Sequence, residues 1–278
     1  MWAAGGRTRF GAARPLSRGT MPVLAGLGQR GVQAAWIDRG NVRASIWTPS
    51  RGFDRPQTVG RGAAEVQLAV SDHDIFIAWR TARSGRNGVA GGGDVLVAGR
   101  SLSTHGFSRP RTVFRGYARD LRLDENHAGR AALAFGVVTS RGAGGTPLAE
   151  DGEMSLREPG RPFGPPVQLP SSTPPGDAPR VAVDDAGTAT ATWLSAGSAA
   201  SSRQDVVFTQ GTPGGSFGTP TIVGEAAGNR PPLVAAANQM TVVAWDNGAQ
   251  YSELLLGNDN PPVLPGNPFR RAVGKRHP

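Results

Sequence analysis

The chain has 278 residues, 40 of them glycine and 23 proline, and it contains no cysteine, which excludes disulfides, thiolate catalysis and cysteine-ligated metal. Short apolar runs separated by glycine and proline turns indicate an all-β fold. The net charge of +9 comes almost wholly from arginine; these arginines are scattered and not interleaved with aromatic residues, which argues against specific nucleic-acid binding.

Residues 1–20 do not resemble a signal peptide, because four arginines interrupt the position of its apolar segment. No stretch of the chain approaches the ~20 apolar residues that cross a bilayer, so we expect no membrane insertion. The segment instead resembles the last two strands of the repeat described below, with Phe10 in the place of its phenylalanine. We expect it to be a partial blade that pairs with the last repeat and closes a ring.

One strand pattern recurs five times: an apolar, alternating segment with a small residue just before a large aromatic one. The intervals between successive aromatics are 43 to 58 residues. Because the aromatic recurs in every copy, we interpret it as core packing and not as a ligand cage. The five aromatics are Trp36, Trp79, Phe135, Trp193 and Trp245.

A second marker, Phe-x-x-Pro, recurs at intervals of 54 to 56 residues, beginning at Phe53, Phe107, Phe163 and Phe217. Two markers that recur in step are strong evidence of an internal repeat of about 54 residues. The expected repeats are 21–64, 65–119, 120–177, 178–228 and 229–278.

Each repeat is expected to hold four short antiparallel strands, named a to d in chain order. In the fourth repeat these are 181–183, 189–193, 205–208 and 221–223, with a tight a–b turn in which Gly187 accepts a positive φ. The sequence therefore predicts an all-β fold, a single β-propeller domain over residues 1–278 with five four-stranded antiparallel blades. A six-bladed ring with one half-formed blade is the alternative.

The pattern resembles the secreted β-propeller repeat proteins of actinobacteria, which are distantly sialidase-like. The matching stretches are Pro179–Trp193 and Gly214–Pro220. The resemblance implies an extracellular or cell-surface location and an undefined binding role, with a cytoplasmic location or a truncated start as alternatives. Sialidases carry Ser-x-Asp-x-Gly-x-x-Trp boxes at the c–d turn, whereas here the c–d turns carry Gly-Phe and an Asp-x-Gly lies at an a–b turn.

Long loops on a rigid scaffold are where binding residues concentrate. The b–c loops at 80–93, 136–152 and 194–204 are the longest connections, and they share one side of the ring with the d–a loops. We expect a ligand site there, formed by polar residues that could bind sugar hydroxyls or a cation; solvated caps of the strand ends are the alternative interpretation. The candidate binding residues are Asp38, Glu65, Arg80, Asp120, Asp177 and Asp246.

A catalytic alternative centres on Tyr117. Sialidase-type hydrolysis needs a tyrosine nucleophile, a carboxylic acid and arginines that hold the substrate carboxylate. Arg115, Tyr117, Arg119 and Asp120 are close together in one expected d–a loop. A lone tyrosine among arginines is also an ordinary surface residue.

His73, between Asp72 and Asp74, is more typical of a solvated turn than of a metal site, so we expect no metal or other cofactor. The first hypothesis is a non-catalytic, monomeric binding or scaffold module that recognises a protein or a glycan through its d–a/b–c side. The second is a divergent glycoside hydrolase of the sialidase type.

Overall fold

The structure is a computed structural model that describes residues 19–84, 90–104, 106–141, 147–170, 179–195, 203–228, 230–248 and 251–257. This part of the chain contains 21 strands and one 3₁₀ helix of three residues, Gly28–Arg30. The predicted all-β class is confirmed. None of the described residues forms a helix with the length and apolar character needed to cross a membrane.

The first sheet is antiparallel and follows the chain. Its order is β1-β2-β3-β4, and β5 pairs with β3 beside β4. The strands are β1 (Thr20–Gly26), β2 (Val32–Asp38), β3 (Asn41–Thr48), β4 (Gly52–Phe53) and β5 (Gln57–Arg61). Residue 20, expected in the partial blade, therefore lies in β1.

The second sheet has seven antiparallel strands in the order β14-β13-β12-β11-β10-β7-β6. The pair β8 (Arg83–Ser84) and β9 (Ala90–Gly91) is separate from it. The strands of the seven-stranded sheet are β6 (Ala63–Val70), β7 (Asp74–Thr81), β10 (Gly93–Ser101), β11 (Arg111–Glu125), β12 (Ala131–Arg141), β13 (Pro147–Arg157) and β14 (Val167–Gln168).

The strand β11 corrects the expectation of a d–a loop around Tyr117, because the chain stays extended throughout that segment. Its first part pairs with β10 and its second part with β12. The change of partner occurs at Ala118, which pairs with Gly93 of β10 and with Val137 of β12. Two residues later, Asp120 has a φ of 51° and lies where the register shifts between Arg119 and Arg122. One left-handed residue and a bulge reorient a strand without a loop.

The expected b–c loop at 136–152 is also mostly strand. Val137 pairs with Asp151 and Val138 with Glu150, so β12 and β13 continue as an extended hairpin. Val137, Val138 and Thr139 are β-branched residues that favour strand, and they continue β12 beyond the aromatic. Most of the expected loop at 194–204 lies outside the described residues.

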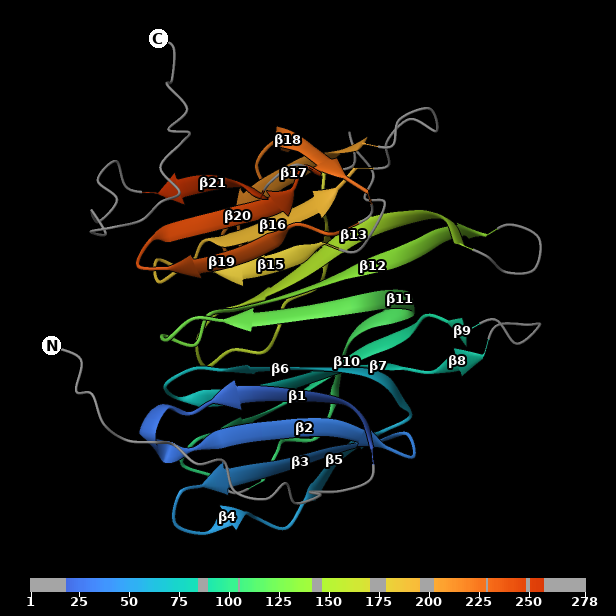
Figure 1. Cartoon of the computed structure of the whole chain (residues 1–278). Helices are drawn as coiled ribbons and strands as arrows, with labels where there is room; N and C mark the ends of the chain where they lie inside the picture. Colours follow the sequence, from blue (N-terminus) through green and yellow to red (C-terminus); the bar gives the residue numbers. More distant parts are fainter. Residues whose placement is uncertain are drawn as a thin grey trace, which may run out of the picture.

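Two smaller antiparallel sheets complete the described chain. Figure 1 shows β1, β6, β11, β15 and β19 following one another from the bottom to the top of the view, and each contacts the next. The remaining strands are β15 (Arg180–Val183), β16 (Ala189–Leu194), β17 (Arg203–Gly211), β18 (Thr221–Ala227), β19 (Leu233–Ala237), β20 (Met240–Asp246) and β21 (Tyr251–Gly257).

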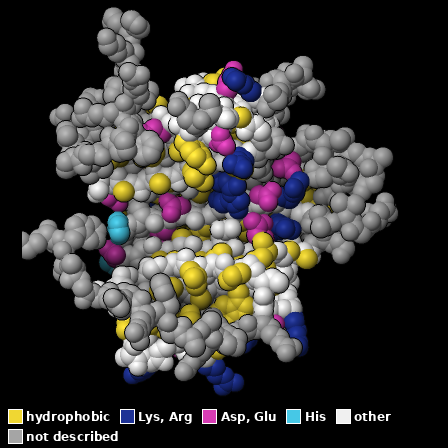
Figure 2. Space-filling view, in the orientation of Figure 1, with side chains coloured by type: hydrophobic (Ala, Val, Ile, Leu, Met, Phe, Trp, Pro, Cys, Tyr) yellow, Lys and Arg dark blue, Asp and Glu magenta, His cyan; other side chains and the backbone are white. Residues whose placement is uncertain are grey.

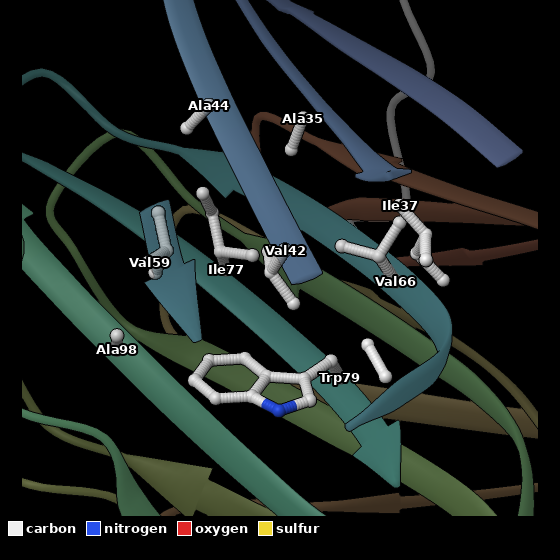
Figure 3. Close-up of a cluster of buried hydrophobic side chains, with 10 residues drawn as sticks. Ala35, Ile37, Val42, Ala44, Val59, Val66, Ile77, Trp79 and Ala98 are labelled. Carbon is white, nitrogen blue, oxygen red and sulfur yellow. The ribbon is translucent and has the colours of Figure 1, made fainter. Parts of the chain in front are cut away.

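The repeating aromatics are buried, which confirms their predicted core role: all five are at most 7% exposed. Figure 3 shows Trp79 beneath aliphatic side chains of the first sheet, including Val42 and Val59. A Cβ on Gly60 of β5 would clash with the Trp79 indole, and the same relation joins Gly224 of β18 to Trp245. A small residue on one sheet thus makes room for the aromatic of the next.

The Phe-x-x-Pro motif has a local structural cause. In all four copies the residue after the phenylalanine donates its backbone N–H to a carbonyl at the end of the preceding long strand. These bonds run from Asp54 to Ile46, Ser108 to Gly99, Gly164 to Leu156 and Gly218 to Gln210, at 2.8 to 3.0 Å. The predicted turn at Gly187 is likewise confirmed, with a φ of 89°.

Candidate functional site

Three of the predicted binding residues meet at the bend of β11. The Glu65 side chain, from β6, is 8% exposed and lies 3.3 Å from Nε of Arg80 on the neighbouring strand β7. Its other oxygen accepts a hydrogen bond of 2.9 Å from the backbone N–H of Leu121 and lies 3.6 Å from the Arg122 guanidinium. The carboxylate therefore links β6 and β7 to the second part of β11.

The electrostatics of Glu65 reflect this position. Burial raises its pKa above the ordinary value, Arg80 counteracts that shift through its charge and hydrogen bond, Asp120 raises the pKa again and Arg122 lowers it. Asp120 thus lies within electrostatic range of Glu65. Two arginines and one backbone N–H compensate the buried charge of Glu65, whose carboxylate therefore forms the buried centre of the cluster.

The outer part of the cluster is more exposed. Arg119 forms an ion pair with Glu150 of β13, and its other nitrogen lies 3.8 Å from Asp120. The Arg119 and Asp120 side chains are 38% and 39% exposed, while Glu150 is 12% exposed. Figure 2 shows charged side chains of both signs gathered across the middle of this face, with hydrophobic side chains below them. We call Arg119, Asp120, Arg122 and Glu150 the charged rim.

The other predicted residues lie elsewhere. Asp38 ends β2, where its backbone carbonyl accepts a hydrogen bond from Asn41. Asp246 ends β20 and pairs with Arg230 at 3.3 Å. Asp177 lies outside the described residues.

The residues of the catalytic alternative lie on one strand. Tyr117 is 39% exposed and Arg115 is exposed, both on the first part of β11, and Arg119 and Asp120 belong to the charged rim. A sialidase-type assignment of these residues stays a prediction.

Two rim residues were missed from the sequence. Glu150 lies inside what the sequence predicts to be a loop, and Arg122 follows the expected d–a loop that contains Asp120. The one available signal was alternation at 147–157, which places Glu150 across the hairpin from Val138. His127 lies 3.7 Å from Asp72, and both side chains are mostly exposed. Among the described residues, no three His, Asp or Glu side chains are grouped as a metal site requires.

No protein-family model matches the sequence, and no curated protein is significantly similar to it. Among solved structures, the chain is similar to a polysaccharide lyase of family PL25, an ulvan lyase bound to -[GlcA(1-4)Rha3S]-, with 13% identity and a TM-score of 0.58 over 86% of this chain. The polysaccharide lyase Uly1 is matched with 11% identity and a TM-score of 0.54 over 87% of this chain.

The chain spans 64% and 58% of the length of these two lyases. At such identities the two lyases show a shared fold and no shared activity. The β-propeller domain of the Trilobed protease from Pyrococcus furiosus is also matched, with 7% identity and a TM-score of 0.48 over 87% of this chain and 71% of that one.

Proposed function

We propose that the protein is a non-catalytic β-propeller module that binds a glycan through the charged rim. The observation that supports this most is the convergence of Glu65, Arg80 and Asp120, with Arg119 and Glu150 partly exposed above them. Alternating carboxylates and guanidinium groups supply acceptors and donors side by side, which suits the paired hydroxyls of a sugar ring. The two lyases that share the fold act on polysaccharides, which is compatible with this proposal.

The experiment compares two Arg–Glu pairs whose arginines are similarly exposed. Arg119→Ala removes the rim pair with Glu150, whereas Arg130→Ala removes the pair with Glu158, 3.1 Å long and about one third exposed, at the other end of β12. We expect a glycan array followed by calorimetry to show a loss of about tenfold or more for Arg119→Ala, since a charged hydrogen bond contributes about 1.5–3 kcal/mol. Arg130→Ala should bind as the unmodified protein does.

Two outcomes overturn this proposal. Equal affinities for both variants would remove the rim from the binding site. Hydrolysis of a sialoside substrate by the unmodified protein, abolished in Tyr117→Phe, would replace the binding role with the glycosidase alternative.

We also propose that the described sheets are parts of a five-bladed ring, with two blades sharing β11, and that the segment 1–20 supplies the missing strands of the last blade. Gly19 supports this, because a Cβ there would clash with Trp36 just as at Gly60 with Trp79. The chain has no cysteine, so Ala13→Cys with Ser252→Cys, tested beside neighbouring pairs, should form a cross-link within one chain. Cross-links only between chains, or none, would contradict closure.

Location and oligomeric state complete the proposal. We propose a monomer that acts outside the cell or at its surface. Light scattering of the purified protein and fractionation of the producing cells test these two points.

A further inference from the structure

A cleft of about 860 Å³ opens at the opposite end of the strands from the charged rim. Asp74, which begins β7, lines it, whereas Arg80 of the rim cluster lies near the end of the same strand. Its walls are the end of β10, the beginning of β11 and the segment that follows β13. The cleft therefore lies between the β7–β10 part of the second sheet and the β12–β13 part.

The floor of the cleft is formed by side chains that contact one another. Arg157 of β13 is 3% exposed, forms an ion pair of 2.8 Å with Asp74 and one of 3.4 Å with Glu125, and lies 4.2 Å from the centre of the Phe76 ring. Phe76 meets Phe163 edge to face, with ring centres 5.8 Å apart. Because these groups hold one another, the floor keeps its shape without a ligand.

The walls carry uncompensated positive charge. Five arginines and one carboxylate, Asp74, line the cleft, and Asp74 is engaged by Arg157. Arg100 points away, toward Gln33 of the first sheet at 3.4 Å. The three that remain are exposed and form no ion pair with any described residue: Arg109, Arg111 and Arg161.

Elsewhere some exposed arginines are paired, as Arg203 is with Glu225, while others such as Arg51 and Arg55 form no ion pair with a described residue. The cleft differs in gathering three such arginines around one opening. Three unpaired guanidinium groups at the mouth of one cleft repel one another unless an anion lies between them. Guanidinium groups bind sulfate, carboxylate and phosphate oxygens through two parallel hydrogen bonds. The arrangement thus has the donor set of an anion site.

We propose that this cleft binds an acidic polysaccharide, a chain of sugars bearing sulfate or carboxylate groups. Its volume is that of a ligand larger than one inorganic ion. Pro110, Pro162 and Phe163 supply apolar wall against which the C–H faces of sugar rings can pack. A nucleic acid fits less well, because Phe76 is engaged by both Arg157 and Phe163, which leaves the half-buried Phe163 as the one ring of the described lining on which a base could stack. The site is independent of the charged rim in position and in ligand chemistry.

The test uses two triple variants with the same net charge. Arg109→Gln, Arg111→Gln and Arg161→Gln together alter the cleft; Arg30→Gln, Arg51→Gln and Arg55→Gln alter exposed arginines at the same end of the first sheet. Arg55 is the matched control for Arg109, because each precedes the proline of its Phe-x-x-Pro motif.

Calorimetry with heparin oligosaccharides and with polygalacturonate, at two salt concentrations, distinguishes sulfate from carboxylate recognition. We expect the cleft variant to lose affinity by about tenfold or more and to show a weaker salt dependence, since fewer charge contacts remain. The control variant should stay within about twofold of the unmodified protein.

Three results would overturn the proposal. Equal losses in both triple variants would show that net charge alone attracts the polymer. Tighter binding of a single-stranded oligonucleotide, lost in the cleft variant, would make the ligand a nucleic acid. The absence of binding to both acidic glycans by the unmodified protein would remove the site.

Discussion

Two interfaces within the protein are filled in opposite ways. The first interface, between the first sheet and the β6–β7–β10 strands, is apolar and places the Trp79 indole over Gly60. The second interface, between β7–β10 and β12–β13, pairs two medium-sized rings, Phe114 and Phe135, at 5.2 Å and adds the buried Arg157 with its two carboxylates.

The difference shows that the residue facing the aromatic decides how an interface is filled. Where that residue is Gly60, the Trp79 indole lies over it. Where it is Phe114, the aromatic is the smaller ring of Phe135. The end of the second interface holds charged groups that also form the floor of the arginine cleft.

The largest expected effect comes from a substitution that breaks the charged interface. Arg157→Ala leaves Asp74 without its cation and the carbonyls of Gly129 and Arg161 without their donor, and removing one partner of a buried pair costs about 3–5 kcal/mol. Urea unfolding measures the loss. Arg130→Ala, which removes a pair that is about one third exposed, should cost about 1 kcal/mol or less. Similar losses for the two variants would show that the buried charges do not hold this interface together.

The next largest effect comes from a substitution that disturbs the apolar interface. Gly60→Ala places a methyl group against the buried Trp79 indole and should cost about 1–3 kcal/mol through overpacking. The control is Gly26→Ala on β1, where a Cβ meets no atom within 4 Å; it should be neutral or slightly stabilising. Trp79→Phe in the Gly60→Ala background should recover part of the loss. If Gly60→Ala is as harmless as the control, close packing is not required there.

The third effect is a pH dependence of at most about 1.4 kcal/mol per pH unit, and it sharpens the electrostatic difference. Burial raises the pKa of Glu125 from 4.5 to about 8, although Arg157 opposes the shift, and one of its oxygens has no hydrogen-bond partner among the described residues. Between these two pH values the folded state holds a proton that the unfolded state releases. Stability should therefore fall as pH rises through that window.

Glu125→Gln removes this titration. The free energy of unfolding of the variant should rise relative to the unmodified protein between pH 5 and pH 8, by at most about 1.4 kcal/mol per pH unit. Urea titrations at four pH values measure the difference in unfolding free energy between the variant and the unmodified protein. The contributions of other buried carboxyl groups are the same in both proteins and cancel in this difference. Parallel pH profiles would assign the titration to another group.

Predictions from sequence succeeded where the cause is local. The Phe-x-x-Pro turn depends on a hydrogen bond between residues eight or nine positions apart, such as Gly218 and Gln210, and the turn at Gly187 depends on one dihedral angle. They failed at β11, since the alternation that predicted two strands and a loop is equally compatible with one bent strand. Glu65, Arg80 and Asp120 lie near one another in the structure, and the place where they meet depends on that bend.

The sequence by itself determined the β class, the Phe-x-x-Pro turns and the buried aromatics, because strand alternation, turn residues and a recurring large side chain act over a few residues. Only the tertiary structure decided which charges meet. Arg119 and Glu150 are 31 positions apart, and Arg157 and Asp74 are 83 apart. The packing of the sheets decides which charges are compensated by an ion pair and which stay uncompensated at the arginine cleft. An ion pair forms only where packing brings opposite charges on two strands together.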